Sequence, residues 1–225
     1  MAPSEQALWA VRAAESRASR GPSISLGILA RVDAVAEVLA RCETLPTLFA
    51  EAVVLADAGT APCAAAPPRT RLRARPLDGH FGAQRTALAR LSRTAWMLQL
   101  DADETLTDDT LARLPSFLRA AERDGVAALG LPRRNRVDGV LSDHYPDPQY
   151  RLCRRTVSYE GRVHERPRLL SRARQSRLAL GLHIEHALDA ERVRARTLRY
   201  GAMSEGATDT ARRPDERALL TPFSP

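Results

Sequence analysis

The segment 96–106 constrains the fold more than any other part of the chain. Its first five residues, WMLQL, are mostly apolar and compatible with a β-strand, and the carboxylates of Asp101, Asp103 and Glu104 follow them closely. A short apolar run of this kind indicates a buried strand. In an open α/β sheet, ligands bind beyond the carboxyl ends of the strands. The segment therefore predicts an α/β protein whose site lies where this strand ends.

The two aspartates of this segment are candidate metal ligands. Asp101 and Asp103 alternate with Ala102, so an extended chain would project both carboxylates to the same side. Two hard oxygen ligands suit Mg²⁺ or Mn²⁺, particularly when the phosphates of a substrate complete the coordination shell. A simpler interpretation is that the acidic residues only cap the next helix. Capping explains residues 107–109 but not the pair at the end of the strand.

Length and composition favour one soluble domain. The 225 residues suffice for a single α/β domain with a sizeable core, and no apolar run approaches the roughly 20 residues of a membrane span. Segment 1–21 lacks the uninterrupted apolar core of a secretory signal. The three cysteines form no metal-ligand pattern, which predicts a reduced, cytoplasmic protein.

The net charge of +7 rests entirely on arginine, because the sequence contains no lysine. A basic surface attracts nucleic acid, anionic lipid headgroups or phosphorylated substrates. Aromatic residues make up only 4% of the chain, and we find no nucleic-acid-binding motif. We therefore expect no nucleic-acid partner. A phosphorylated or lipid-linked acceptor, with peripheral contact to an anionic membrane at its inner face, fits the charge better.

The first elements of the chain follow the order strand, helix, strand. We expect a strand over 23–29, a helix over 33–42 and a strand over 52–55, which together imply a parallel βαβ unit. The long polar segment 133–149 is expected to be a loop that carries substrate contacts. Further elements are expected as a short strand within 69–76, helices over 82–91, from 107 to 123 and from 189 to 205, and strands over 126–131, 150–153, 156–159 and 178–184.

Three motifs carry a resemblance to a known family. They are WMLQLDADETL at 96–106, YPDPQYRLCRR at 145–155 and GRVHE at 161–165. With them the chain resembles the family 2 glycosyltransferases of bacterial envelope biosynthesis, such as the sugar transferases of lipopolysaccharide core. The resemblance implies a single Rossmann-like GT-A domain at 23–205, with a mostly parallel central sheet flanked by helices. Residues 1–22 would form an N-terminal arm and residues 206–225 a loose C-terminal tail.

The resemblance also implies how a nucleotide-diphosphate sugar donor is bound. Asp101 and Asp103 would hold the cation, Mg²⁺ or Mn²⁺, that bridges the diphosphate. Arg151 would lie near the diphosphate, because its planar guanidinium suits phosphate oxygens. His186 is the expected further metal ligand, with His183 as the alternative.

In an inverting transferase, a carboxylate must also deprotonate the acceptor hydroxyl. Glu165 in GRVHE is the expected base, and Asp147 in YPD is the alternative. His164 is expected to orient Glu165, and Asp57 to contact the nucleoside. The acceptor would be an envelope glycan or a lipid-linked glycan.

Two other interpretations stay open. The motifs expected near 30–33 and 57–62 are incomplete, so the chain could be a catalytically eroded GT-A scaffold or binding subunit. The segment LQLDADETL also resembles the opening motif of haloacid dehalogenase-like phosphohydrolases, with Asp101 as nucleophile and Asp103 as acid and base. The absence of lysine and the position of the motif in mid-chain weigh against a phosphohydrolase.

Overall fold

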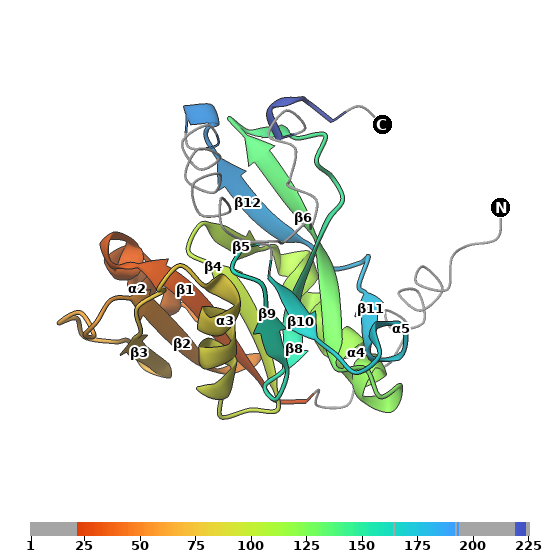
Figure 1. The fold of residues 1–225 in the computed structure, drawn as a ribbon, viewed down its shortest axis with the longest axis horizontal. Coiled ribbons are helices and arrows are strands. Elements are labelled where there is room, and N and C mark those ends of the chain that lie inside the picture. The colour runs from red at the N-terminus through yellow and green to blue at the C-terminus, as the bar shows by residue number, and fades with distance from the viewer. Residues whose placement is uncertain (1–21, 164, 192, 194–218, 224–225) are drawn as a thin grey trace.

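The computed structural model describes residues 22–163, 165–191, 193 and 219–223 (Figure 1). They form an α/β fold with one ten-stranded sheet, a separate two-stranded sheet and few helices. The helices are η1 (Val32–Ala34), α2 (Val35–Cys42), α3 (Phe81–Arg90), α4 (Asp108–Arg123) and α5 (Arg172–Gln175). The strands are β1 (Ile24–Arg31), β2 (Phe49–Asp57), β3 (Thr70–Ala74), β4 (Trp96–Asp101), β5 (Glu104–Leu106), β6 (Ala128–Val137), β7 (Val140–Leu141), β8 (Asp147–Arg154), β9 (Ser158–Glu160), β10 (Arg166–Arg168), β11 (Ser176–Leu178) and β12 (Ile184–Leu188).

The large sheet is mixed and mostly parallel. Its strand order is β3-β2-β1-β4-β8-β6-β12-β5, and β7 and β11 both pair with β6 outside this path. The first four strands are parallel, β8 is antiparallel to β4 and β6, and β12 is parallel to β6. The sheet curls strongly, so that β6 and β12 extend away from the β1–β4 half (Figure 1). The predicted α/β class and the mostly parallel sheet are confirmed, although the helices that flank the sheet are few.

Alternate residues of β1 face two different layers. Ile24, Leu26 and Ile28 belong to the main core, to which α2 and α4 contribute their buried faces. Leu29 points the other way and packs with Leu88 of α3, the helix that covers the face toward the viewer in Figure 1. Because both faces are covered, β1 reads as a nearly continuous apolar run, as buried parallel strands do. The layers on both faces of β1 also fix the position of β4, which pairs with β1.

The prediction of a loop over 133–149 is wrong for much of that segment. Strand β6 continues to Val137 and pairs with β7 after a turn at Asp138 and Gly139, whose φ values of 50° and 83° are both positive. An Asp-Gly pair is a common solution for such a turn, because both residues tolerate positive φ. Strand β8 then begins within the expected loop, at Asp147.

The prediction of one strand over 178–184 is also wrong. Strand β11 ends at Leu178 and β12 begins at Ile184. Between them the chain turns, and the amide of Leu182 donates to the carbonyl of Ala179 at 2.9 Å. In the sequence this apolar run resembles one strand, because periodicity alone does not reveal a turn within it.

The termini are described only in part. The expected arm and most of the helix expected over 189–205 lie outside the described residues. Within the expected tail, Leu219 packs with Leu188 and Val193. None of the helices in the described ranges is long and apolar enough to span a bilayer.

Candidate functional site

The candidate site lies at the carboxyl end of β4, a strand in the middle of the sheet. Asp101 is the last residue of β4, and the chain turns at residues 102 and 103 before Glu104 begins β5. The extended geometry expected from Asp101 to Asp103 is therefore wrong. The two aspartates contact different groups: Asp101 contacts buried arginines, and Asp103 faces a histidine.

Arg85 of α3 links two of the predicted functional residues. Its side chain is only 1% exposed. Nη2 donates to both oxygens of Asp101, at 2.7 and 3.0 Å, and Nε donates to Oε1 of Glu165. Arg85 is not among the residues predicted from the sequence, although helical spacing places it on the same face as Leu88, which is buried.

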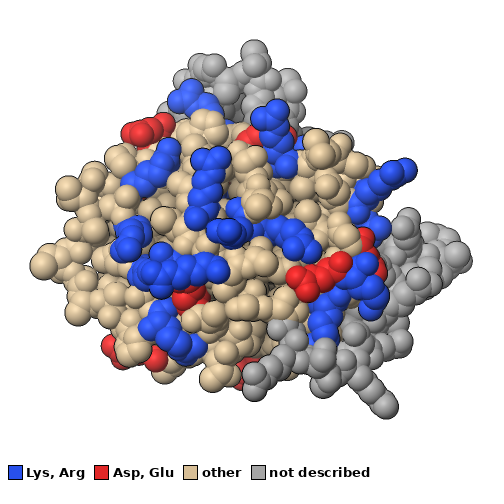
Figure 2. Space-filling model, turned by 90° about the horizontal axis from the view of Figure 1, so that it is seen from below, with Lys and Arg blue, Asp and Glu red and all other residues tan. Residues whose placement is uncertain are grey.

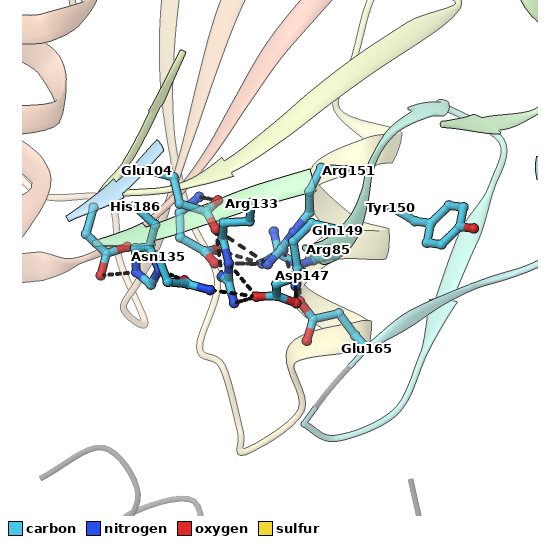
Figure 3. Close-up of polar contacts among 12 residues, drawn as sticks. Arg85, Glu104, Arg133, Asn135, Asp147, Gln149, Tyr150, Arg151, Glu165 and His186 are labelled. Carbon is cyan, nitrogen blue, oxygen red and sulfur yellow. Dashed lines mark hydrogen bonds and ion pairs between the residues drawn. The ribbon is translucent and has the colours of Figure 1, made fainter. Parts of the chain in front are cut away.

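Arg151 of β8 makes a second link between the same two carboxylates. Its Nη1 donates to Oε1 of Glu165 at 3.0 Å, and its Nη2 donates to Oδ2 of Asp101 at 3.2 Å. The guanidinium groups of Arg85 and Arg151 lie close together, with Glu165 beside them (Figure 3). Residues from α3, β4, β8 and the segment before β10 thus meet at one point.

A close backbone contact brings α3 to the segment that carries Glu165. The amide of Phe81 donates to the carbonyl of Arg162 at 2.9 Å, and the amide of Gly82 donates to the carbonyl of Gly161 at 3.0 Å. A Cβ on Gly82 would lie only 2.7 Å from that second carbonyl oxygen. Glycine is therefore required for the approach that sets Arg85 against Glu165.

The network continues through Glu104, which is fully buried. Its Oε2 accepts from the amide of Asp101 at 2.9 Å, and its Oε1 accepts from Nη1 of Arg133 at 2.9 Å. Arg133 also donates to Oδ2 of Asp147, from Nε at 2.9 Å and from Nη2 at 2.7 Å. Asp147 is thus linked to Glu104 through Arg133 (Figure 3), and through Glu104 to the backbone amide of Asp101.

His186 of β12 meets Asp103 at the edge of this network. Its Nδ1 lies 2.7 Å from Oδ1 of Asn135, whose Nδ2 donates to Asp147 at 3.1 Å. Because the amide oxygen of Asn135 can only accept, we assign the proton of the histidine ring to Nδ1. Nε2, the other ring nitrogen, lies 3.4 Å from Oδ2 of Asp103. His183, the alternative ligand, lies beside Tyr145 instead.

The described residues fit a divalent cation in part. Asp103 and His186 supply one oxygen donor and one nitrogen donor that face each other, and Asn135 orients the histidine as partners of metal ligands do. Within the described ranges, no group of three or more His, Cys, Asp or Glu residues could hold a metal ion. A cation here would need substrate phosphates or water to complete its shell. The metal role of Asp101 stays a prediction.

The carboxyl groups of the network differ in their pKa values. Burial raises the pKa of Asp101 to about 7, against the effect of Arg85 and with help from Glu104. For Glu165, burial acts in the same direction, but Arg85 outweighs it and holds the pKa below its usual value. Arg133 does the same for Asp147. At neutral pH, Glu165 and Asp147 are therefore ionised.

Two of the other predicted residues have simpler outcomes. Asp57, at the end of β2, accepts a hydrogen bond from the amide of Leu77 at 2.8 Å. This bond stabilises the turn before α3. His164 lies outside the described residues. The predicted contact of Asp57 with a nucleoside therefore stays a prediction, as does the orienting role of His164.

Comparisons with known proteins found similarity among solved structures alone. No protein-family model and no curated protein matches the chain. Among solved structures, the chain is similar to TarS of S. aureus, with 13% identity and a TM-score of 0.39. The match covers 61% of this chain and 30% of the TarS chain.

Proposed function

We propose that the chain is a GT-A glycosyltransferase that moves a sugar from a nucleotide-diphosphate donor to a hydroxyl of an envelope glycan or glycolipid, with inversion. One observation carries the proposal. Asp101, Arg151 and Glu165, chosen from three separate sequence segments, belong to one network at the carboxyl end of a central strand. Ligands of open α/β sheets bind at this position.

Two buried guanidinium groups support the choice of a diphosphate donor. In the part of the chain that the structure describes, Nη1 of Arg85 and Nε of Arg151 are buried without a hydrogen-bond partner. Buried donors without partners are uncommon, and guanidinium groups suit phosphate oxygens. We propose that Asp103 and His186 would hold Mg²⁺ or Mn²⁺ beside them. The ion would supply charge neutralisation for the departing nucleoside diphosphate.

We propose Glu165 as the base that deprotonates the acceptor hydroxyl. Both arginines bind its Oε1, so Oε2 is the oxygen that would take the proton. Its lowered pKa keeps it ionised but makes it a weak base. Asp147 is the alternative, and Arg133 lowers its pKa in the same way.

Donor hydrolysis tests this proposal. Purified protein is incubated with Mn²⁺ and a panel of UDP-, GDP- and ADP-sugars, and the released nucleotide is measured with and without a chelator. We expect release from at least one donor that the chelator abolishes. The absence of both turnover and metal-dependent nucleotide binding would contradict the proposal.

A non-enzymatic GT-A scaffold is the second candidate. One observation favours it: Arg85 and Arg151 already neutralise Asp101, the residue expected to bind the cation. An eroded site of this kind would keep its fold through internal ion pairs and would bind no donor. The same panel separates the two candidates, because a scaffold releases no nucleotide.

The cellular setting is also a proposal. We infer that the chain works in the cytoplasm, on a glycan or lipid-linked acceptor. The basic charge and the motif resemblance support this setting.

A further inference from the structure

Arginine side chains gather at the edge of the sheet opposite to the candidate site. Figure 2 shows this face from below, with basic side chains spread across it and few acidic ones between them. The edge is formed where the parallel strands begin, and the loop 91–95 between α3 and β4 lies at its centre. Asp101, at the far end of β4, faces away from it.

Six arginines surround this loop, and we call them the arginine face. They are Arg69, Arg71, Arg90, Arg93, Arg154 and Arg155, of which Arg71 and Arg154 are half-buried and the other four are exposed.

Hydrogen bonds to the backbone of the loop place two of these arginines beside it. Arg71 donates to the carbonyl of Leu91 at 2.6 Å, and Arg155 donates to the carbonyl of Ser92 at 3.4 Å. Both are carbonyls of the segment that links α3 to β4, so the two side chains flank the same short stretch.

The arginine face contains a hollow of about 430 Å³. It is lined by Ala50, Glu51, Arg69, Thr70, Arg71, Arg93 and Thr94. Glu51 is its only acidic lining residue, and this carboxylate is paired with Arg71 at 2.8 Å. The charges of Arg69 and Arg93 at the hollow thus exceed the negative charge there, which suits a phosphate group.

We propose that the arginine face binds the surface of an anionic membrane, with lipid phosphates against its guanidinium groups. A bilayer presents many phosphates in one plane, and basic side chains near such a surface each add to the attraction. A single-stranded nucleic acid would need aromatic platforms on which bases stack. Among the described residues, Phe49 and Trp96 begin strands at this edge, and both are buried; Arg154 lies over the Trp96 ring at 4.9 Å. These features favour lipid.

Vesicle flotation with the full chain tests the proposal without reference to sugar transfer. The probes are vesicles of phosphatidylcholine with and without phosphatidylglycerol, at low and high salt. The test variant replaces the exposed residues Arg90, Arg93 and Arg155 by serine. The control variant replaces three exposed arginines at the opposite edge, Arg31, Arg113 and Arg136, and so changes the net charge equally.

We expect the wild type to bind anionic vesicles in a salt-sensitive manner. The affinity should fall about 100-fold in the test variant, because each basic residue near the surface contributes about 1 kcal/mol. In the control variant the affinity should fall little. Equal losses in both variants would overturn the proposal, because net charge alone would then explain binding. So would tighter binding to a single-stranded oligonucleotide than to the vesicles. Circular dichroism of both variants checks that the fold is retained, and serine substitutions at exposed positions should preserve it.

Discussion

Nη2 of Arg85 donates hydrogen bonds to both oxygens of Asp101, at 2.7 and 3.0 Å, from a side chain that is 1% exposed. The arginine sits on α3 and the aspartate ends β4, so this pair ties a helix on one face of the sheet to the end of a central strand. Through its Nε, the same arginine also reaches Glu165. The buried guanidinium group of Arg85 therefore links α3, the end of β4 and the segment that carries Glu165.

Replacing Arg85 by leucine should destabilise the protein strongly. The change leaves Asp101 and Glu165 close together with only Arg151 to neutralise them, and breaking a buried ion pair costs about 3–5 kcal/mol. Urea unfolding measures the loss. Arg85→Lys keeps the charge and should lose less. A leucine variant as stable as the wild type would show that the pair contributes nothing.

Gly82→Ala should also destabilise the fold, by about 1–3 kcal/mol, because the new Cβ would meet the carbonyl oxygen of Gly161 at 2.7 Å. The carbonyl oxygen belongs to the backbone, so it cannot rotate away from the new Cβ as a side-chain atom could. Gly59→Ala is the matched control, since nothing lies within 4 Å of its added Cβ. Thermal unfolding of the two variants should differ clearly, and equal midpoints would argue against the close approach of α3.

Glu165 should stabilise the folded state at neutral pH and lose that effect in acid. Because its pKa is lower in the folded state than in the unfolded chain, the stabilisation is present above the unfolded pKa and disappears as the pH falls through the folded pKa. Glu165→Gln should therefore flatten the decline in unfolding free energy below about pH 4. Glu160→Gln, at an exposed position, serves as the control. An unchanged acid limb in Glu165→Gln would contradict the pairing.

Asn135→Leu should weaken Mn²⁺ binding about 10- to 100-fold, the usual effect of removing a group that orients a ligating histidine. The substitution removes the oxygen that lies 2.7 Å from Nδ1 of His186. Calorimetry or electron paramagnetic resonance with Mn²⁺ measures the affinity. His183→Ala should leave the affinity unchanged. If His183→Ala binds Mn²⁺ more weakly than Asn135→Leu does, His183 is the ligand and not His186.

The sequence predicts the strands of the parallel half well, because β1, β2 and β4 are buried on both faces and form apolar runs. It fails for the second half of β6, where Arg133, Arg134 and Arg136 make the sequence resemble a loop. Carboxylates from other segments pair with those charges: Glu104 and Asp147 with the first, Glu185 with the other two. Such compensation depends on tertiary contacts, which local patterns do not encode.

The candidate site shows the same limit. Asp101, Arg151 and Glu165 were found because each lies in a recognisable motif. Arg85 was missed because a lone arginine in a helix looks like a solvent-exposed residue. Its burial depends on Gly82 allowing the helix to approach Gly161, and this is a property of the packed fold.

The most direct test of the proposed sugar transfer compares Asp103→Asn and Glu165→Gln with the wild type, in the presence of Mn²⁺ and the donor that the panel selects. Nucleotide binding and nucleotide release are both measured, and Asp108→Asn, at an exposed position on α4, is the control. We predict that Asp103→Asn loses binding and release, while Glu165→Gln binds the donor normally and releases almost nothing. Release at wild-type rates from both variants would contradict the assignment of this network as a glycosyltransferase site.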